Sequence, residues 1–246
     1  MFKKFIIDLK SNLFDELSTS TKFEDIAKGR QVAVLVNDKH DLIPIIRTTT
    51  VYNEPAQKFL PIHHNIMDHI RKKTKLNITF NNASIEIYDF HYRNMKFHTD
   101  QSLDLKCNSY ICLFSCYEND SNNSKDIRKL QIQNKITKEC SEISLDNGSI
   151  VLFSTSANHE HLHKIILESN TSTNKWLGIT FRLSKTFIKF NDNVPYIYPT
   201  ETILRIATNE EKKNFFKHKG NENLNIEYTY PEIDYTISIS DTLFVI

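Results

Sequence analysis

The stretch MKFHTDQSLDL, residues 95–105, carries the residues that decide the fold and chemistry predicted for this chain. It places His98 and Asp100 two positions apart, beside an apolar run. In an extended segment, side chains two positions apart point to the same side, so both can reach one metal ion. A histidine-x-aspartate pair alone is a weak signal, because surface residues produce it often. It predicts a metal site only together with a further ligand from elsewhere in the chain.

Short β-type runs separated by turn residues surround this stretch, from residue 77 to about 190. They include NITF, SIEIYDF, MKFH, SYICLFSCY, RKLQIQNK, EISL, SIVLF, HKIIL and WLGITFRLSKTF. Such even spacing favours a sandwich or barrel. Between EISL and SIVLF, Asp146-Asn147-Gly148 predicts a hairpin turn. The polar segment 118–126 predicts an exposed loop, because it has almost nothing to bury.

Helical signals flank the β region on both sides. Before it, amphipathic spacing predicts helices over 2–16 and 62–73, and a capping box that opens at Thr21 predicts another helix that stops at Gly29. After it, a second capping box predicts a helix over about 208–220, and the strand-like tail YTISISDTLFVI closes the chain. The mixture of elements predicts an α+β protein.

Length, charge and cysteine content limit the classes of protein. A chain of 246 residues with 39% hydrophobic residues fits one domain with one substantial core. Its 31 basic and 30 acidic residues give no strong positive field for holding long duplex nucleic acid. No apolar run approaches the ~18 residues of a membrane span. The four cysteines form no CxxC pair, which is typical of a reducing, intracellular compartment.

A second group of histidines, in NHEHLHKIIL at residues 158–167, can supply the missing ligand. Two histidines and one carboxylate make the facial triad, which occupies one face of an octahedral Fe(II) and leaves the other face open. Three histidines compete for the distant position: His159, His161 and His163. His163 directly precedes an apolar strand that would anchor it, so it is the preferred ligand and His161 the fallback. The predicted metal ligands are therefore His98, Asp100 and His163.

The run WLGITFRLSKTF adds an arginine to an otherwise apolar strand. Arg182 and Ser184 alternate onto the same face, together with Thr180 and Thr186. An arginine that points into a β core needs a carboxylate partner, because an unpaired buried charge is costly. A dicarboxylate cosubstrate would supply that partner through a bidentate pair, with the serine hydroxyl adding a hydrogen bond. The alternative is an internal salt bridge to an aspartate or glutamate of the chain.

Taken together, these motifs resemble the 2-oxoglutarate- and Fe(II)-dependent dioxygenases, and within them most closely the AlkB-like branch. The resemblance covers residues 77 to 190 and rests on His98-x-Asp100, the following LDL, the run DNGSIVLFSTSANHEHLH that ends on His163, and the arginine strand. It implies a double-stranded β-helix, or jelly-roll, core flanked by N-terminal and C-terminal helices. It also implies that the triad binds iron and that the downstream arginine holds the far carboxylate of 2-oxoglutarate.

The arginine strand departs from the AlkB-like pattern, which usually has two arginines six residues apart. If Arg182 is the first of the pair, Ile188 stands at the second position; if it is the second, Trp176 stands at the first. We prefer the former register, because Arg182 and Ser184 then match the R-x-S pattern of the wider superfamily. Lys185 or Lys189 could supply the missing cation, although neither has the parity and spacing of the second arginine.

The upstream asparagine-x-tyrosine of the family is represented only by Glu86-Ile87-Tyr88. The asparagine is missing, and Tyr88 is the expected hydrogen-bond donor to the cosubstrate. The predicted cosubstrate-binding residues are therefore Arg182, Ser184 and Tyr88.

The resemblance implies decarboxylation of 2-oxoglutarate to succinate with dioxygen, coupled to hydroxylation of a C–H bond, or to demethylation where the carbon is an N-methyl group. No catalytic residue beyond the metal ligands is expected, because the cofactor performs the difficult chemistry. The candidate substrates are a modified nucleic-acid base, with Tyr52, Tyr92 and Tyr117 as candidate clamp residues, a protein side chain or a small molecule. The competing hypotheses are a cupin-like metalloenzyme without 2-oxoglutarate and a non-catalytic binding module on the same fold.

The expected organisation is a single monomeric domain that does not enter a membrane. It spans residues 1–246, with a core at about 77–190 and flanking α/β segments at 1–76 and 191–246.

Overall fold

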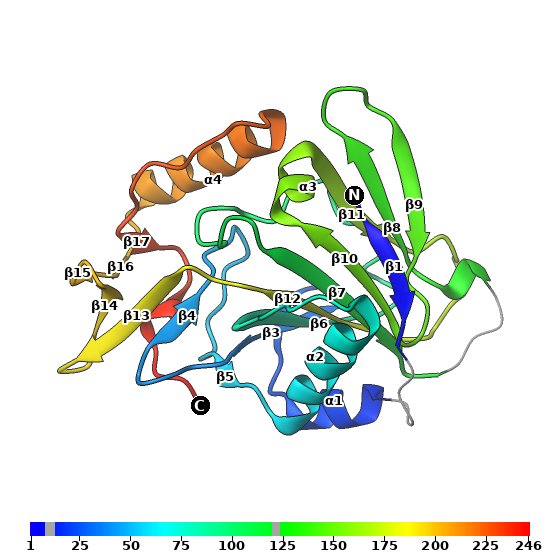
Figure 1. The fold of residues 1–246 in the computed structure, drawn as a ribbon, viewed down its shortest axis with the longest axis horizontal. Helices are drawn as coiled ribbons and strands as arrows, with labels where there is room; N and C mark the ends of the chain where they lie inside the picture. The colour runs from blue at the N-terminus through cyan, green and yellow to red at the C-terminus, as the bar shows by residue number, and fades with distance from the viewer. Residues whose placement is uncertain (8–12, 120–123) are drawn as a thin grey trace.

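The computed structural model describes residues 1–7, 13–119 and 124–246, and consists mostly of antiparallel sheets with few helices (Figure 1). The largest sheet contains, in spatial order, β1 (Lys3–Ile6), β10 (Ser149–Ser154), β7 (Tyr110–Tyr117), β12 (Trp176–Arg182), β6 (Asn82–Tyr88), β3 (Arg30–Val36) and β2 (Glu24–Ala27). A short strand, β5 (Gln57–Lys58), pairs with β3.

Smaller sheets and the helices complete the molecule. One sheet contains β11 (His161–Ile166), β8 (Lys129–Asn134) and β9 (Cys140–Ser144). Another contains β15 (Thr202–Ile203), β14 (Val194–Tyr198), β13 (Thr186–Asn191) and β4 (Ile43–Ile45), and β16 (Arg205–Ile206) pairs with β17 (Tyr235–Thr236). The helices are α1 (Phe14–Ser20), α2 (Pro61–Thr74), α3 (Thr155–Glu160) and α4 (Asn209–Leu224), with 3-10 turns at Ser124–Asp126 and Ile239–Thr242. In the part of the chain that the structure describes, no helix has the length and apolarity needed to span a membrane.

The central strand β12 separates two cores. Its residues alternate between the two faces of the large sheet. Leu177, Ile179 and Phe181 pack in a cluster that includes residues of α1 and α2, whereas Trp176 belongs to a second cluster on the opposite face. Figure 1 shows α1 and α2 together on one side of the large sheet, with β8, β9 and β11 away from them. Arg182, at an even position like Trp176, therefore lies on the side turned away from the two helices. This arrangement is consistent with the predicted jelly-roll core.

The predicted opening helix over 2–16 is wrong over most of the residues that the structure describes there. Residues 3–6 form β1, which pairs antiparallel with β10, and α1 begins only at Phe14. Residues 8–12 of the prediction lie outside the described part. The run KKFI is too short to give a distinct period, and the exposed edge of β10 selects the extended conformation.

The helix predicted from Thr21 to Gly29 is also wrong, because Glu24–Ala27 is β2 and pairs with β3. The supposed capping residue Glu24 instead accepts a hydrogen bond from the backbone N–H of Asn53, at 3.0 Å. Gly29 turns the chain between the strands with a φ of 75°, and a side chain there would overlap the carboxylate of Asp89.

The other predicted helices were confirmed, one of them with a longer range, whereas the predicted C-terminal strand is shorter. The helix over 62–73 is α2, and the C-terminal capping box opens α4, which continues through Gly220 to Leu224. The terminal tail contains only the two strand residues of β17 before a 3-10 turn.

The turn at Gly148 is present, with a φ of 68°, but it does not close a hairpin. β9 pairs with β8, whereas β10 pairs with β7 and β1, so the turn carries the chain from one sheet to another. The predicted exposed loop over 118–126 lies partly outside the described residues, which omit 120–123.

Candidate metal centre

Two short backbone hydrogen bonds bring the predicted histidines together. His163 lies in β11, and His98 pairs with it in an isolated antiparallel bridge rather than within a strand MKFH. The N–H of His98 donates to the carbonyl of His163 at 3.0 Å, and the N–H of His163 donates back at 2.7 Å. Residues directly opposite across such a bridge have adjacent side chains. The two imidazole rings accordingly lie 4.7 Å apart between centroids.

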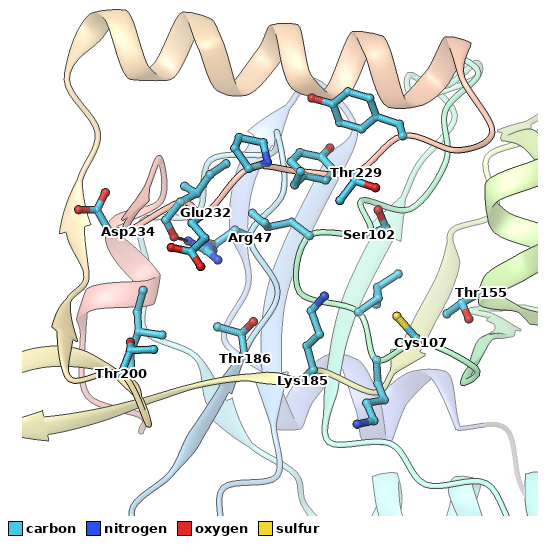
Figure 2. A pocket seen from close by; sticks show the side chains of 18 of the residues that line it. Arg47, Ser102, Cys107, Thr155, Lys185, Thr186, Thr200, Thr229, Glu232 and Asp234 are labelled. Atoms are coloured by element: carbon cyan, nitrogen blue, oxygen red, sulfur yellow. Dashed lines mark hydrogen bonds between the residues drawn. The ribbon is translucent and has the colours of Figure 1, made fainter.

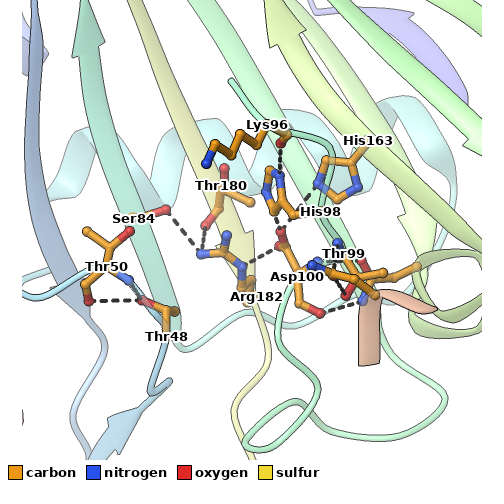
Figure 3. Close-up of polar contacts among 12 residues, drawn as sticks. Thr48, Thr50, Ser84, Lys96, His98, Thr99, Asp100, His163, Thr180 and Arg182 are labelled. Atoms are coloured by element: carbon orange, nitrogen blue, oxygen red, sulfur yellow. Dashed lines mark hydrogen bonds and ion pairs between the residues drawn. The ribbon is translucent and has the colours of Figure 1, made fainter. Parts of the chain in front are cut away.

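Asp100 completes a group of three donor atoms (Figure 3). Its Oδ1 lies 3.4 Å from Nε2 of His163 and 4.0 Å from Nε2 of His98. One ligand atom from each residue lies within 4.8 Å of the others, and among the described residues this is the one such cluster of histidine, cysteine or acidic side chains. Two imidazole nitrogens and one carboxylate oxygen on one side of an ion fit the donor set of a facial-triad iron site.

Hydrogen bonding sets the tautomer of one histidine. Nδ1 of His98 lies 2.9 Å from the carbonyl oxygen of Lys96, a contact that requires the proton on Nδ1. The lone pair of Nε2 then faces Asp100 and the shared position. Metal-bound histidines generally donate their other ring N–H in this way, which fixes both the tautomer and the ring orientation. Nδ1 of His163 is buried and has no partner among the described residues.

The electrostatics favour the metal-binding protonation states. Desolvation and the neighbouring His163 lower the pKa of His98 to about 3, although Asp100 opposes the shift. Burial alone would raise the pKa of Asp100, but Arg182 and His163 hold it well below its usual range. A neutral imidazole and an ionised carboxylate are the forms that bind metals. The site therefore has little proton competition from these two residues near neutral pH.

Arg182 pairs directly with the candidate metal ligand. Its Nε donates to Oδ2 of Asp100 at 2.6 Å, and Nη1 donates to Ser84 Oγ at 3.1 Å. This is the internal salt bridge that the sequence left open, and its acid is Asp100 itself. Oδ1 of the carboxylate thus faces the two histidines, and Oδ2 accepts a hydrogen bond from the guanidinium. The remaining terminal nitrogen of Arg182, Nη2, has no hydrogen-bond partner within the described parts of the chain.

The other two residues predicted to bind the cosubstrate lie in different places. Tyr88 is at the opposite end of the same face, where its hydroxyl donates to Glu86. Ser184 lies past the end of β12, and its hydroxyl donates to the carbonyl of Ile45 at 2.6 Å. Ser184 is buried and does not line the cavity at the metal centre.

The triad opens into a cavity of about 580 Å³. Its wall includes the three ligands, Arg182 and Tyr88, with aromatic side chains from Tyr52, Tyr92 and Trp176. A cavity of this size with a mainly apolar wall and a few polar groups is typical of a small-molecule site. Tyr117, the third aromatic residue considered as a clamp, is buried and does not line this cavity.

Trp176 occupies the position at which one register would place a second arginine. Its indole lies over Gly178, where an added Cβ would overlap the ring. Its Nε1 is buried and has no partner among the described residues. The face of β12 towards the cavity therefore carries one cation, Arg182, and one neutral N–H donor.

A second ion pair lies at the far end of the cavity. Nε and Nη2 of Arg30 each donate to Glu86 at 3.1 Å. Arg30 was not predicted from the sequence, because a helix was expected where β2 lies and nothing in the pattern paired residue 30 with residue 88. Asn158, which bonds both backbone groups of Asp100, was not predicted either.

The competing histidines lie outside the triad. His161 Nδ1 lies 3.0 Å from the carbonyl of Ala157, and His159 lines a separate cavity of about 830 Å³. This second cavity lies beneath the C-terminal segment, and Lys185 points into it (Figure 2). It holds no cluster of metal-ligating side chains among the described residues.

Comparison with protein-family models gives no match, and comparison with curated protein sequences gives none. Among solved structures, the chain is similar to a crystal structure of a Pseudomonas putida prolyl-4-hydroxylase, with 13% sequence identity and a TM-score of 0.43. The similarity covers 74% of this chain and 92% of that chain. A likeness at this level carries no argument about function, so the function of this protein has to be inferred from the geometry of the site. The AlkB-like branch stays a prediction.

Proposed function

We propose that this protein is a 2-oxoglutarate- and Fe(II)-dependent oxygenase with a double-stranded β-helix core, in which His98, Asp100 and His163 bind the iron. The observation that carries the proposal is the convergence of their donor atoms within 4.8 Å at the wall of a cavity. Two imidazoles and one carboxylate leave open positions on an octahedral Fe(II) for a chelating 2-oxo acid and dioxygen. When bound, the iron and 2-oxoglutarate supply the oxidising chemistry, and the protein positions the reactants and shields them from solvent.

The charges in the cavity support a dianionic cosubstrate. Among the buried charges at the cavity, Arg182 pairs with Asp100, Arg30 with Glu86 and Lys219 with Glu222, so these pairs cancel. A divalent iron would add two positive charges to this enclosed space, and buried uncompensated charge is unfavourable. The two carboxylates of 2-oxoglutarate would neutralise it.

In this proposal, Arg182 has two roles. Its Nε orients Asp100, and its unpartnered Nη2 is available to one carboxylate of the cosubstrate. Tyr88 is the proposed hydrogen-bond donor at the far end of the cavity, and to donate to the cosubstrate its hydroxyl would have to release Glu86.

The prime substrate is proposed to present a C–H bond to the iron through the open side of this cavity. A modified nucleic-acid base follows from the AlkB-like resemblance, and the rings of Tyr52 and Tyr92 in the wall are suited to stack on a base. A protein side chain and a small molecule are the other substrate classes. Attack on an N-methyl carbon would result in demethylation, and attack on another carbon would give an alcohol.

Anaerobic titration with Fe(II) and 2-oxoglutarate tests the proposal. We expect a weak visible charge-transfer band in the wild type and in the control His161→Ala, and no band in His98→Ala. Succinate release should then be measured with a panel of methylated oligonucleotides, peptides and small molecules to identify the prime substrate. A wild type that gives no band at saturating iron and cosubstrate contradicts the proposal.

A second candidate function is metal binding without 2-oxoglutarate chemistry, as in a cupin-like metalloenzyme. The observation in its favour is that both guanidinium groups in the cavity already have carboxylate partners. It predicts that the protein binds Fe(II) and that adding 2-oxoglutarate changes neither the spectrum nor the affinity.

A further inference from the structure

Helix α4 packs on the rest of the molecule mainly through polar side chains. Its buried residues are Phe215, Lys219 and Glu222. A surface helix normally buries an apolar stripe. The buried part of α4 instead consists of one aromatic ring and an ion pair, in which Lys219 Nζ lies 2.8 Å from Glu222 Oε2. Burying an ion pair is unfavourable unless its remaining hydrogen-bonding groups are satisfied, so the partners of this pair determine where α4 docks.

Those partners converge on Thr99. Lys219 Nζ donates to the backbone carbonyl of Thr99 at 2.6 Å and to its hydroxyl at 2.7 Å. One turn further along α4, the side-chain oxygen of Asn223 accepts from the N–H of Thr99 at 3.1 Å and from its hydroxyl at 3.2 Å. Every polar group of Thr99 is thus bonded to α4, and the residue is only 1% exposed.

Thr99 stands between two of the proposed metal ligands. Successive side chains of an extended segment point to opposite sides. With Thr99 held against α4, His98 and Asp100 turn to the other side of the segment, where their ligand atoms meet that of His163 (Figure 3). A rotation of this peptide segment would move both ligand atoms together.

Asn94 and His98 form isolated bridges with Ile166 and His163, but no residue between His98 and Leu105 forms a β-bridge that would resist such a rotation. His98 forms a single bridge, and the next residues are held by side chains instead. Asn158 accepts from the N–H of Asp100 at 2.8 Å and donates to its carbonyl at 2.7 Å. On the other side, Glu222 of α4 accepts from the N–H of Ser102 at 2.8 Å. Helix α4 therefore bonds the chain on both sides of Asp100.

We propose that α4 is a positioning arm for the metal centre, in which Lys219 and Asn223 hold Thr99 so that His98 and Asp100 face one ion. The inference rests on the proposed metal site. It adds that metal binding requires the contacts of Lys219 and Asn223 with Thr99, which no sequence motif indicates. The arm does not contact the ion, so its effect is on the geometry and affinity of the site. Outer hydrogen-bond partners of metal ligands typically contribute about 10- to 100-fold to affinity.

The test measures binding of Co(II) alone, by its visible absorption, in the full-length protein without oxygen or cosubstrate. We expect Asn223→Ala and Lys219→Met to weaken Co(II) binding by about 10- to 100-fold and to change the shape of the absorption bands. The controls Asn214→Ala and Lys217→Met replace the same residue types at exposed positions of α4 and should bind as the wild type does. Thr99→Val and Thr99→Ser form a second pair, in which only valine removes the hydroxyl.

The outcomes separate positioning from simple stabilisation. Thermal unfolding of each metal-free variant shows whether it is folded at the temperature of the titration. If Lys219→Met unfolds because Glu222 is left unpaired, Asn223→Ala and Thr99→Val decide the question. Variants that are less stable yet bind Co(II) with wild-type affinity and bands overturn the positioning role. A wild type that binds Co(II) but gives no spectral response to 2-oxoglutarate with Fe(II) contradicts only the proposed reaction, whereas one that binds no Co(II) overturns both.

Discussion

Asp100 joins the two sides of the proposed centre, because one of its carboxylate oxygens faces the histidines and the other faces Arg182. The guanidinium fixes the carboxylate plane at 2.6 Å and keeps it ionised despite burial. Sequence alternation alone predicted that His98 and Asp100 share a side. It could not predict that the arginine would contact the same aspartate, since that depends on how β12 lies beside a segment outside the sheet.

Replacing Arg182 by methionine tests whether the guanidinium orients the Asp100 carboxylate. Without the ion pair, Oδ2 loses its strongest partner and the carboxylate can rotate, so we expect Co(II) or Fe(II) affinity to fall by about 10- to 100-fold. The control Ser84→Ala removes only the bond to Nη1 at 3.1 Å and should keep most of the affinity. Equal affinities for Arg182→Met and wild type would contradict an orienting role for the arginine.

Asp241, in the 3-10 turn Ile239–Thr242, gives a prediction on stability. Burial raises its pKa to about 6, although its hydrogen bond from Thr236 opposes the shift. The folded state then binds a proton more tightly than the unfolded state, so this residue destabilises the fold progressively from about pH 4 to pH 6, and the loss stays constant above that. At about 1.4 kcal/mol per pKa unit, the loss is of the order of 3 kcal/mol at neutral pH.

Denaturant unfolding of Asp241→Asn across pH 4 to 8 measures this effect. We expect the variant to become more stable than the wild type as the pH rises through this window, with a constant difference above about pH 6. A difference that does not change with pH would contradict the raised pKa.

At the scale of elements, β12 connects the two cores and the proposed site. One face packs against the cluster with α1 and α2, and the other carries Trp176, Gly178 and Arg182 towards the cavity. The indole lies flat because position 178 has no side chain. The cavity volume therefore depends on a glycine within a strand.

Gly178→Ala is expected to destabilise the protein by about 1–3 kcal/mol, because the new methyl group overlaps the indole and forces repacking. The matched control is Gly220→Ala in α4, where an added Cβ meets nothing within 4 Å. That change should stabilise the helix by up to about 1 kcal/mol. Unfolding free energies of the two variants are measured side by side, and a neutral Gly178→Ala would show that the indole does not need this glycine.

Elements with a strong local signal were predictable from the sequence, and those selected by tertiary pairing were not. The periodicity of α2 and the capping box of α4 suffice to place these helices, and alternation placed Arg182 on a polar face. β1 and β2 were mistaken for helices because pairing with sheet neighbours outweighs weak amphipathic spacing in short segments. The hydrogen bonds from α4 to Thr99 have no sequence signal, because no periodicity encodes contacts between segments 120 residues apart.

At the scale of the whole molecule, the proposed ion joins β11, the segment after residue 95 and, through Asp100, the end of β12. These parts come from distant regions of the chain, so an ion that binds them together binds the folded state alone. A ligand of this kind stabilises the fold by about 2.7 kcal/mol at a concentration 100 times its dissociation constant.

Thermal unfolding with and without Mn(II) measures this linkage. We expect a rise in the midpoint that grows with Mn(II) concentration in the wild type and that is lost in His163→Ala. His64→Ala, which changes an exposed histidine of α2, is the control and should respond as the wild type does. A rise of equal size in His163→Ala would show that the stabilising ion binds elsewhere.

Anomalous X-ray scattering from crystals of the protein grown with Mn(II) would locate the proposed ion without reference to any activity. We expect one strong peak bounded by Nε2 of His98, Nε2 of His163 and Oδ1 of Asp100, with Arg182 still paired to Oδ2. A fully loaded crystal with no peak there, or with the ion bound at His159 or His161 instead, would contradict the proposed metal centre.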